Sequence, residues 1–379
     1  MKLILLTTIA FLFTFRCIPL LIKLANKFDI YENQSERKLY LKKTSYLGGI
    51  AIAGGFLLSF LLSSCLFGLH INSIHFSILM GLIVIFFHGL GDDIFEYSSK
   101  KKLLFQLMLA FLLVNYGGLR ISHLERFLPF NEIPEYLGTV LNMLIFMTIV
   151  NAFNLIDGAD GITTVSALIP CIYFAVVFIS NDQWVWGAMA AALTGSLVSY
   201  FLFNKPPAYI FMGDNGSLFI GTLLASFCIY FIDHGNTFTH QSSSARVITA
   251  FAVISLPILD LLRLFFYRLI NKRSPFSADR EHIHHLFMNL LQKTWDLKLL
   301  LLVAQVQIFI TLFALLMKNG NWFYFITACT IGYFLFIKGV KILIAQAIKN
   351  KANSQPITMN TGLTIFPEFE LQEKLEMKR

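Results

Sequence analysis

Apolar residues gather in about eleven long segments along the chain, separated by short polar connections. Most segments are close to the roughly 20 residues that an α-helix needs to cross a bilayer, and none shows the alternation of a barrel strand. Because hydrocarbon offers backbone groups no other partner, the pattern predicts an all-α, polytopic integral membrane helical bundle with about eleven transmembrane helices. The segments cover residues 3–22, 45–67, 74–90, 103–118, 137–156, 161–180, 183–203, 216–235, 246–270, 297–317 and 322–345.

The composition excludes two broad classes of protein. Of the 379 residues, 56% are hydrophobic and 14% are charged, whereas a soluble domain carries about 25% charged residues. One water-soluble core cannot hold this apolar surplus, so a soluble enzyme is excluded. The five cysteines are odd in number and lie inside apolar segments, which excludes a secreted disulfide framework. Arg16 interrupts the first segment and no A-x-A cleavage pattern follows, so we expect a retained span.

Lysine and arginine residues concentrate in every second connection between the predicted spans. The positive-inside rule then predicts that the N-terminus lies outside and the C-terminus lies in the cytoplasm. The net charge of +8 falls mostly on the cytoplasmic face, where it attracts anionic lipid head groups and phosphate substrates. The basic residues are scattered over short loops, and this argues against a nucleic-acid partner.

Polar clusters fall at the cytoplasmic ends of different spans, at residues 91–93, 151–161, 211–217 and 274–285. A charge at mid-bilayer costs about 2.5–3.5 kcal/mol even on mild insertion scales, so such clusters need water, a cation or a function. Asp92 and Asp93 repel each other, and a divalent cation or a shared proton relieves the repulsion. A solvated helix end is the simpler alternative for this pair.

The next two clusters predict turns that carry acids. Polar residues at every third position from Asn151 to Asp160 cannot share one helical face. With glycines at 158 and 161, we expect a helix that ends near Asp157 and a tight turn in which Asp160 caps the next helix. A second turn that contains glycines is expected to place Asp214 near the N-terminus of the eighth span. Helix N-termini attract anions and the metal ions bound to them. Plain capping and turn roles are the alternative.

Residues 279–285 form the densest ionisable cluster of the chain. Arg280 and the histidines at 282, 284 and 285 suit an oxyanion, because imidazole and guanidinium groups donate to phosphate oxygens. A zinc site is the first alternative, but the H-E-x-x-H spacing is missing and no cysteine is near. Ordinary interfacial histidines are the second alternative.

Taken together, these stretches resemble the polyprenyl-phosphate N-acetylhexosamine-1-phosphate transferase family, glycosyltransferase family 4. The motifs are a glycine pair at 48–49, the acid pair at 92–93, Asn-x-x-Asn-x-x-Asp-Gly-x-Asp-Gly at 151–161, Phe-Met-Gly-Asp at 211–214 and Ser-Pro-Phe-x-x-Asp-Arg-x-His-x-His-His at 274–285. The last motif is similar to the WecA-like GlcNAc-1-phosphate transferases, whereas phospho-MurNAc-pentapeptide translocases more typically carry consecutive histidines there. Ser45 and Lys272 depart from the proline and glycine that the family pattern favours.

The resemblance implies transfer of N-acetylhexosamine-1-phosphate, with GlcNAc-1-phosphate foremost, from a UDP-N-acetylhexosamine to undecaprenyl phosphate with release of UMP. It implies Mg²⁺ as cofactor, with Mn²⁺ as a substitute. It further implies a multi-pass protein of the bacterial inner membrane whose site faces the cytoplasm and starts envelope polysaccharides such as lipopolysaccharide O-antigen. We expect a single transmembrane catalytic domain over residues 1–349 and a polar, mobile cytoplasmic tail over 350–379, with a homodimer as one open assembly state.

The resemblance also implies roles for single residues. Asp92 is the base or orienting group for the lipid phosphate, and the catalytic set also includes Asp93 and Asp157. The metal ligands are Asn154 and Asp214, and the uracil contacts are Asp160 and Phe211. The phosphate-binding residues are Lys100, Lys102, Arg280, His282, His284 and His285.

Two other classes of function compete with this interpretation. Gly89-Leu90-Gly91-Asp92 matches the G-x-G-D element of intramembrane aspartyl proteases, with Asp260 as the partner acid. A transporter would also need many spans, but transporters place polar groups near the midplane in two related halves. Here the polar residues lie at one edge, and no related halves are evident.

Overall fold

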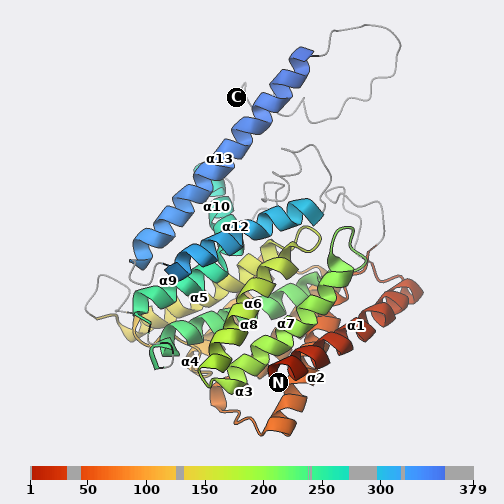
Figure 1. Cartoon of the computed structure of the whole chain (residues 1–379), viewed down its shortest axis with the longest axis vertical. Coiled ribbons are helices and arrows are strands. Elements are labelled where there is room, and N and C mark those ends of the chain that lie inside the picture. The colour runs from red at the N-terminus through yellow and green to blue at the C-terminus, as the bar shows by residue number, and fades with distance from the viewer. Residues whose placement is uncertain are drawn as a thin grey trace.

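The chain folds into a bundle of α-helices, as the hydrophobic pattern predicts (Figure 1). The computed structural model describes residues 2–31, 44–124, 132–237, 239, 241–272, 297–316 and 321–354. Within these ranges the β-structure is limited to an isolated bridge between Ser45 and Ile210. The prediction of an all-α, polytopic architecture is therefore confirmed.

The first eight helices correspond one for one to the first eight apolar segments. They are α1 (Lys2–Phe28), α2 (Gly48–Phe67), α3 (Ser73–Phe95), α4 (Ser99–Asn115), α5 (Glu135–Leu155), α6 (Ile162–Ser180), α7 (Trp184–Asn204) and α8 (Gly213–His234). A short 3-10 helix, η2 (Gly235–Thr237), follows α8.

The ninth segment differs from the prediction of one span, because it forms two helices. These are α9 (Ser243–Val253) and α10 (Ser255–Ile270), which meet at 81°. The chain continues with α12 (Leu297–Leu316) and α13 (Trp322–Ser354). In the described part of the chain, eight helices are long and apolar enough to cross a membrane, or nine when the bent pair is one span. Helices α4 and α12 provide the other apolar segments.

Helices α7 and α8 form the centre of the bundle. In the most apolar stretch of each helix, 83% of the residues of α7 and 94% of those of α8 are buried, against 22% of those of α1. Helices α1, α2 and α6 pack around α7, and α3 and α5 pack around α8. Small residues allow this close packing, as at Gly195, where a Cβ atom would lie 2.2 Å from the carbonyl oxygen of Thr7. The outer helices turn phenylalanine and leucine side chains outward, as expected in lipid.

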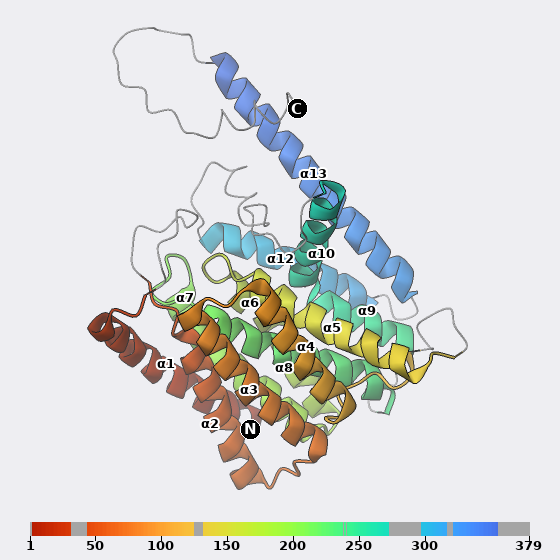
Figure 2. The same ribbon diagram turned by 180° about the vertical axis from the view of Figure 1, so that it is seen from behind.

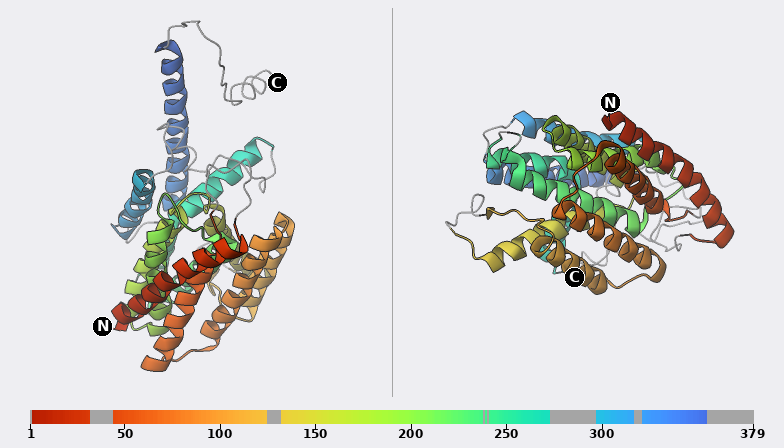
Figure 3. Two further views of the ribbon diagram at one scale, coloured as in Figure 1. Left: turned by 90° about the vertical axis from the view of Figure 1, so that its right-hand side faces the viewer. Right: turned by 90° about the horizontal axis from the view of Figure 1, so that it is seen from below.

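One end of the bundle gathers the turns that carry acids, and we call it the acidic end. Contacts across it join the ends of different helices: Gly48 N donates to Phe211 O at 3.0 Å, and Gly161 N donates to Asn204 Oδ1 at 2.9 Å. Asp214 N donates to Asp93 Oδ1 at 2.7 Å. The views in Figure 2 and Figure 3 show α13 projecting far beyond the other helices.

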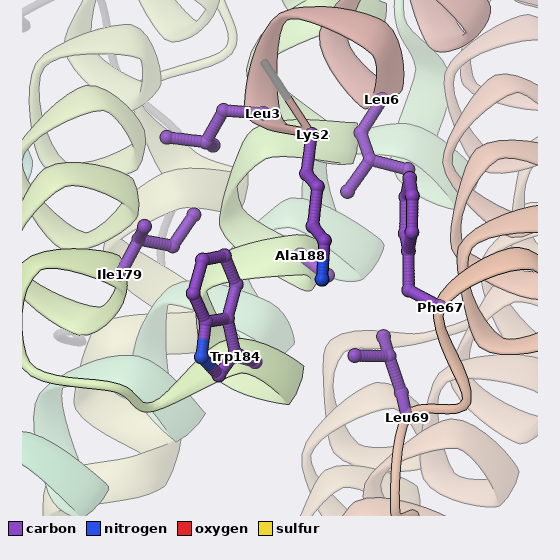
Figure 4. Close-up of a pocket in the computed structure, with 8 residues that line it drawn as sticks. All are labelled: Lys2, Leu3, Leu6, Phe67, Leu69, Ile179, Trp184 and Ala188. Atoms are coloured by element: carbon purple, nitrogen blue, oxygen red, sulfur yellow. The ribbon is translucent and has the colours of Figure 1, made fainter.

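The opposite end of the bundle contains a small apolar pocket (Figure 4). The Lys2 ammonium points into it and lies 5.0 Å from the centre of the Phe67 ring and 5.1 Å from that of Trp184. A cation between aromatic rings is typical of an anchor at a membrane interface. The other lining residues are Leu3, Leu6, Leu69, Ile179 and Ala188, so the pocket contains none of the predicted site residues.

Candidate active site

Side chains from four helices meet at the acidic end. Asp92 comes from the last turn of α3, Lys102 from the first turn of α4, Asn154 from the last turn of α5 and Asp214 from the first turn of α8. The Lys102 ammonium lies 2.5 Å from Asp92 Oδ2 and 2.9 Å from Asp214 Oδ2. The Asp92 side chain is 1% exposed, whereas those of Lys102 and Asp214 are 31% and 30% exposed. One cation therefore bridges a buried acid and an accessible one.

Asp92 is fixed by the backbone that follows α3. Its Oδ1 atom accepts a hydrogen bond from Tyr97 N at 2.8 Å. The chain turns at Glu96, whose φ of 49° ends the helix and brings the amide of Tyr97 back over it. A buried carboxylate needs such donors and a cation, because burial without them is costly. Asp92 is thus oriented with one oxygen toward its own turn and the other toward Lys102.

Asp93 points instead to the start of α8. Its Oδ1 atom accepts from Asp214 N at 2.7 Å, and its Oδ2 atom accepts from Asn215 N at 3.1 Å and from Asn215 Nδ2. The first amides of a helix have no partner within it and carry the positive end of the helix dipole. Asp93 therefore caps α8 from another helix. Burial of the Tyr46 hydroxyl, followed by the negative charge of Asp93, raises the pKa of Tyr46, in the segment before α2.

The two predicted metal ligands lie side by side. Asn154 Nδ2 donates to Asp214 Oδ1 at 2.7 Å and to Ser217 Oγ at 3.0 Å. Gly213 has a φ of 75°, so a left-handed turn starts α8 and brings Asp214 to this position, as the sequence predicts. The two oxygens of Asp214 are thereby divided between Asn154 and Lys102.

The predicted role of Asp160 as a helix cap is wrong. Asp160 Oδ2 accepts from Ala208 N at 2.9 Å, and the residue is buried. Helix α6 instead starts from Gly161, whose φ is 76° and whose amide donates to Asn204 Oδ1. Asn204 of α7 thus supplies the acceptor at the start of α6, and the Asp160 side chain instead binds the segment between α7 and α8.

The other two predicted contacts flank this segment. Phe211 is half-buried, and its backbone binds Ser45 O at 2.7 Å and Gly48 N at 3.0 Å. Asp157 Oδ1 accepts from Thr163 Oγ1 at 2.8 Å. The structure thus places Asp157 and Asp160 in the turn between α5 and α6, and the segment that Asp160 holds leads directly to Phe211.

The predicted phosphate-binding residues separate into two groups. Lys102 reaches the acids, whereas Lys100 is exposed at the start of the same helix. The residues Arg280, His282, His284 and His285 lie outside the described residues, so their roles stay predictions. Within the described ranges, no group of three or more His, Cys, Asp or Glu side chains is arranged to hold a metal ion.

The polar clusters in the sequence contain most of the supporting residues of the site but did not reveal their partners. Asn215 binds Asp93, Ser217 binds Asn154, and Asn151 Nδ2 donates to Gln106 Oε1 at 2.6 Å between α5 and α4. The available signal was the presence of amide side chains within apolar segments, where an unpaired polar group is costly. That signal names the residues but not their partners.

The protease interpretation requires two acids that act together, and their contacts separate them. Asp260 binds Arg263 Nη2 at 3.0 Å and the Tyr333 hydroxyl at 3.3 Å. Asp92 binds Lys102 and the backbone of Tyr97. The two acids thus belong to different networks, one between α10 and α13 and one between α3, α4 and α8.

Comparison with known proteins agrees with the site. Residues 75–232, which carry Asp92, Lys102, Asn154 and Asp214, match the profile described as glycosyl transferase family 4. The probable undecaprenyl-phosphate N-acetylglucosaminyl 1-phosphate transferase of Bacillus subtilis (strain 168) is 29% identical over 273 residues, 71% of this chain and 73% of that protein. The undecaprenyl-phosphate alpha-N-acetylglucosaminyl 1-phosphate transferase of Yersinia pestis is 28% identical over 75% of both chains. The protein of that name from Escherichia coli (strain K12) is 28% identical over 73% of this chain and 74% of its own.

Proposed function

We propose, from the match of residues 75–232 to the profile described as glycosyl transferase family 4, that the protein belongs to this family and transfers GlcNAc-1-phosphate from UDP-GlcNAc to undecaprenyl phosphate with release of UMP. The observation that carries the proposal is the convergence of Asp92, Lys102, Asn154 and Asp214 at one end of the bundle. The names of the relatives supply the acceptor and the sugar.

The electrostatics of the site suit this reaction. Donor and acceptor are both phosphate anions, and two unit charges 4 Å apart repel by about 4 kcal/mol at an effective dielectric of 20. Lys102 offers a positive charge between the acids, and its side chain is accessible. Arg280 and the histidines at 282, 284 and 285, in the part of the chain that follows α10, would bind the diphosphate.

The donor atoms at the site fit Mg²⁺. Magnesium prefers hard oxygen ligands and is usually held by one or two carboxylates together with substrate phosphates. Asp214 is an accessible carboxylate, and the side-chain amide of Asn154 contacts it. These two residues would hold Mg²⁺, which supplies charge neutralisation on the diphosphate of the donor.

The residues of the chain would bind, orient and hold the reactants. Asp92 would orient the lipid phosphate or accept its proton, while Asp160 and Phe211 would bind the uracil. An oxygen of the lipid phosphate attacks the phosphorus attached to the sugar, the bond from that phosphorus to the bridging oxygen breaks, and UMP leaves. Direct attack suffices, because the lipid phosphate is already a nucleophile.

We place the acidic end at the cytoplasmic face of a bacterial inner membrane. Lys27, Lys102 and Lys205 lie at helix ends on this side, while the far end has Lys2 and Arg120. This charge asymmetry supports an external N-terminus, a cytoplasmic C-terminus and about eleven crossings, with α4, α12 and the bent pair counted. The phosphate of the lipid acceptor would then lie at the depth of the site while its chain stays in hydrocarbon.

A transfer assay tests the proposal. Membranes that contain the protein, supplied with labelled UDP-GlcNAc, undecaprenyl phosphate and Mg²⁺, should form labelled lipid and an equal amount of UMP. EDTA should stop the reaction, and added Mg²⁺ should restore it. No turnover with any UDP-N-acetylhexosamine would refute the proposal, and preference for UDP-MurNAc-pentapeptide would favour the translocase alternative.

A further inference from the structure

The bend between α9 and α10 originates at a proline. In a continuous helix the amide of residue 257 would donate to the carbonyl of Val253, but Pro257 has no N–H and its ring clashes with that carbonyl. Helix α9 ends at Val253, and α10 departs at 81°. The carbonyl of Val253 is left without its usual helical donor and lies in an apolar interior, where it needs another partner, while Ala252 O accepts from the amide of Ile254.

Helix α12 faces both carbonyls. Gln307 Nε2 donates to Val253 O, and Thr311 Oγ1 lies 3.2 Å from Ala252 O, although its single proton has a nearer acceptor in Gln307 O at 2.8 Å. The same Gln307 nitrogen donates to Ser166 O at 3.0 Å. That carbonyl lies four residues before Pro170 of α6, so it too lacks its helical donor. One fully buried amide group therefore binds two carbonyls that two prolines on different helices leave free.

Helix α13 holds α10 beyond the bend. Asp260 and Arg263 form an ion pair whose side chains are 2% and 3% exposed. The Tyr333 hydroxyl of α13 donates to Asp260 Oδ1 at 3.3 Å. Figure 2 shows α10 alongside α13, away from the direction of α9. Contacts on both sides of the bend thus fix the direction of α10.

The surface fixed in this way supports the turn that carries two predicted site residues. Ile156 and Ile162, at the two ends of the turn with Asp157 and Asp160, are buried against Leu256 and Leu259 of α10. The same cluster contains Leu300 and Val303 of α12 and Tyr333 and Ile337 of α13. A change in the direction of α10 would therefore move the surface beneath this turn.

We propose that Gln307 and Tyr333 are positioning residues for the nucleotide of the donor substrate. Gln307 fixes the bend, Tyr333 fixes α10, and α10 sets the position of Asp160 through the turn between α5 and α6. This inference rests on the proposed function, in which Asp160 contacts the uracil. Neither residue is required to touch a substrate.

The test measures steady-state kinetics of Gln307→Leu and Tyr333→Phe with both substrates varied. We expect the KM for UDP-GlcNAc to rise about tenfold, with kcat and the KM for undecaprenyl phosphate within about twofold of wild type. The matched controls are Gln305→Leu and Tyr324→Phe, which change the same residue types at exposed positions of the same helices. Both controls should behave as wild type.

A second measurement addresses the contact of Gln307 with the free carbonyl of Ser166 in α6. In a Pro170→Ala background the new amide can donate to Ser166 O, so Gln307→Leu should lower the melting temperature less than it does alone. Tyr333→Phe removes one hydroxyl and decides the proposal if Gln307→Leu does not fold. The proposal is overturned if the donor and acceptor KM values rise together, or if the variants match their controls. Absence of wild-type turnover would instead refute the proposed function.

Discussion

The neighbouring acids Asp92 and Asp93 have different partners although they share one motif. Successive residues on a helix point about 100° apart, so the two carboxylates face different directions. Asp92 faces Lys102 and the active site, and Asp93 faces the backbone of α8. A sequence shows two adjacent acids, whereas the three-dimensional contacts separate an acid that pairs with Lys102 from an acid that holds the start of a helix.

Removal of the negative charge at Asp92 or Asp214 should therefore abolish most activity. We expect Asp92→Asn and Asp214→Asn each to lower turnover by about 100-fold or more, because a catalytic or metal-holding group is lost. The labelled-lipid assay measures this. The control is Asp182→Asn. Asp182 is exposed at the far end of the bundle, and asparagine tolerates its φ of 60° as well as aspartate does. Near-normal rates in either site variant would contradict the role given to that residue.

Asp93→Asn should show a different signature. The variant keeps one oxygen for the amides of α8 but places an NH₂ group against another donor, so we expect a loss of about 1–3 kcal/mol in the free energy of unfolding. Thermal unfolding in detergent measures this loss, with Asp92→Asn for comparison. If Asp93→Asn lost activity at unchanged stability, Asp93 would belong to the chemistry itself, as the family resemblance implies.

At the scale of helices, the packing of α3 on α8 determines the spacing of the site. A Cβ atom on Gly89 would lie 2.5 Å from Asn215 Cα and 2.8 Å from the carbonyl carbon of Asp214. Both atoms belong to backbone, which cannot rotate away. The two acids of α3 can therefore approach α8 because residue 89 has no side chain.

Gly89→Ala should separate the two helices and reduce activity strongly. Overpacking typically costs about 1–3 kcal/mol, and here the displacement falls within one turn of Asp92 and Asp93. The control is Gly138→Ala in α5, where an added Cβ atom meets nothing within 4 Å. Unfolding temperature and turnover should both fall in the first variant and stay near wild type in the second. Equal behaviour of the two would contradict a tight α3–α8 contact.

The helices were predictable from hydropathy, but the bend was not. Pro19 and Pro170 lie inside continuous helices α1 and α6, whereas Pro257 lies in the first turn of α10, directly after the break from α9. A proline alone does not decide between these outcomes. At the bend beside Pro257, the carbonyl that the proline leaves free is bound by Gln307, which lies about 50 residues further along the chain.

The same reason limits how much of the site the sequence reveals. Motif spacing located Asp92, Asn154 and Asp214 at helix ends, and the structure brings them together. The motif could not show that Asn204 binds Gly161 and so leaves Asp160 to hold Ala208 N. Such contacts join segments that are distant in sequence, and local patterns contain no information on them.

At the scale of the whole molecule, the two ends of the bundle differ in chemistry. The acidic end gathers carboxylates, amides and Lys102, while the other end places Lys2 between Phe67 and Trp184. Among the described residues, the acidic end brings together the acids, amides and lysine that phosphate chemistry needs. The orientation of the protein in the membrane therefore decides which compartment supplies the nucleotide sugar.

Cysteine labelling can test this orientation. In a background without the five natural cysteines, Asp182→Cys should react with a membrane-impermeant maleimide on intact cells. Lys205→Cys, at the acidic end of α7, should react only after the membrane is made permeable. Both positions are exposed, so accessibility differs only by compartment. The reverse pattern would place the acidic end outside and contradict the proposed orientation.

The cap that Asp93 forms on α8 also restricts where insertions and deletions can occur in the sequence. A single-codon insertion or deletion between Gly89 and Asp92 would rotate the last turn of α3 by about 100°, so that one acid takes the direction of the other and the second acid points away from both sets of partners. The connection at residues 68–72, where Gly68 has open space around it, has no such constraint. Length variation among descendants should therefore accumulate between α2 and α3 and be absent from the end of α3.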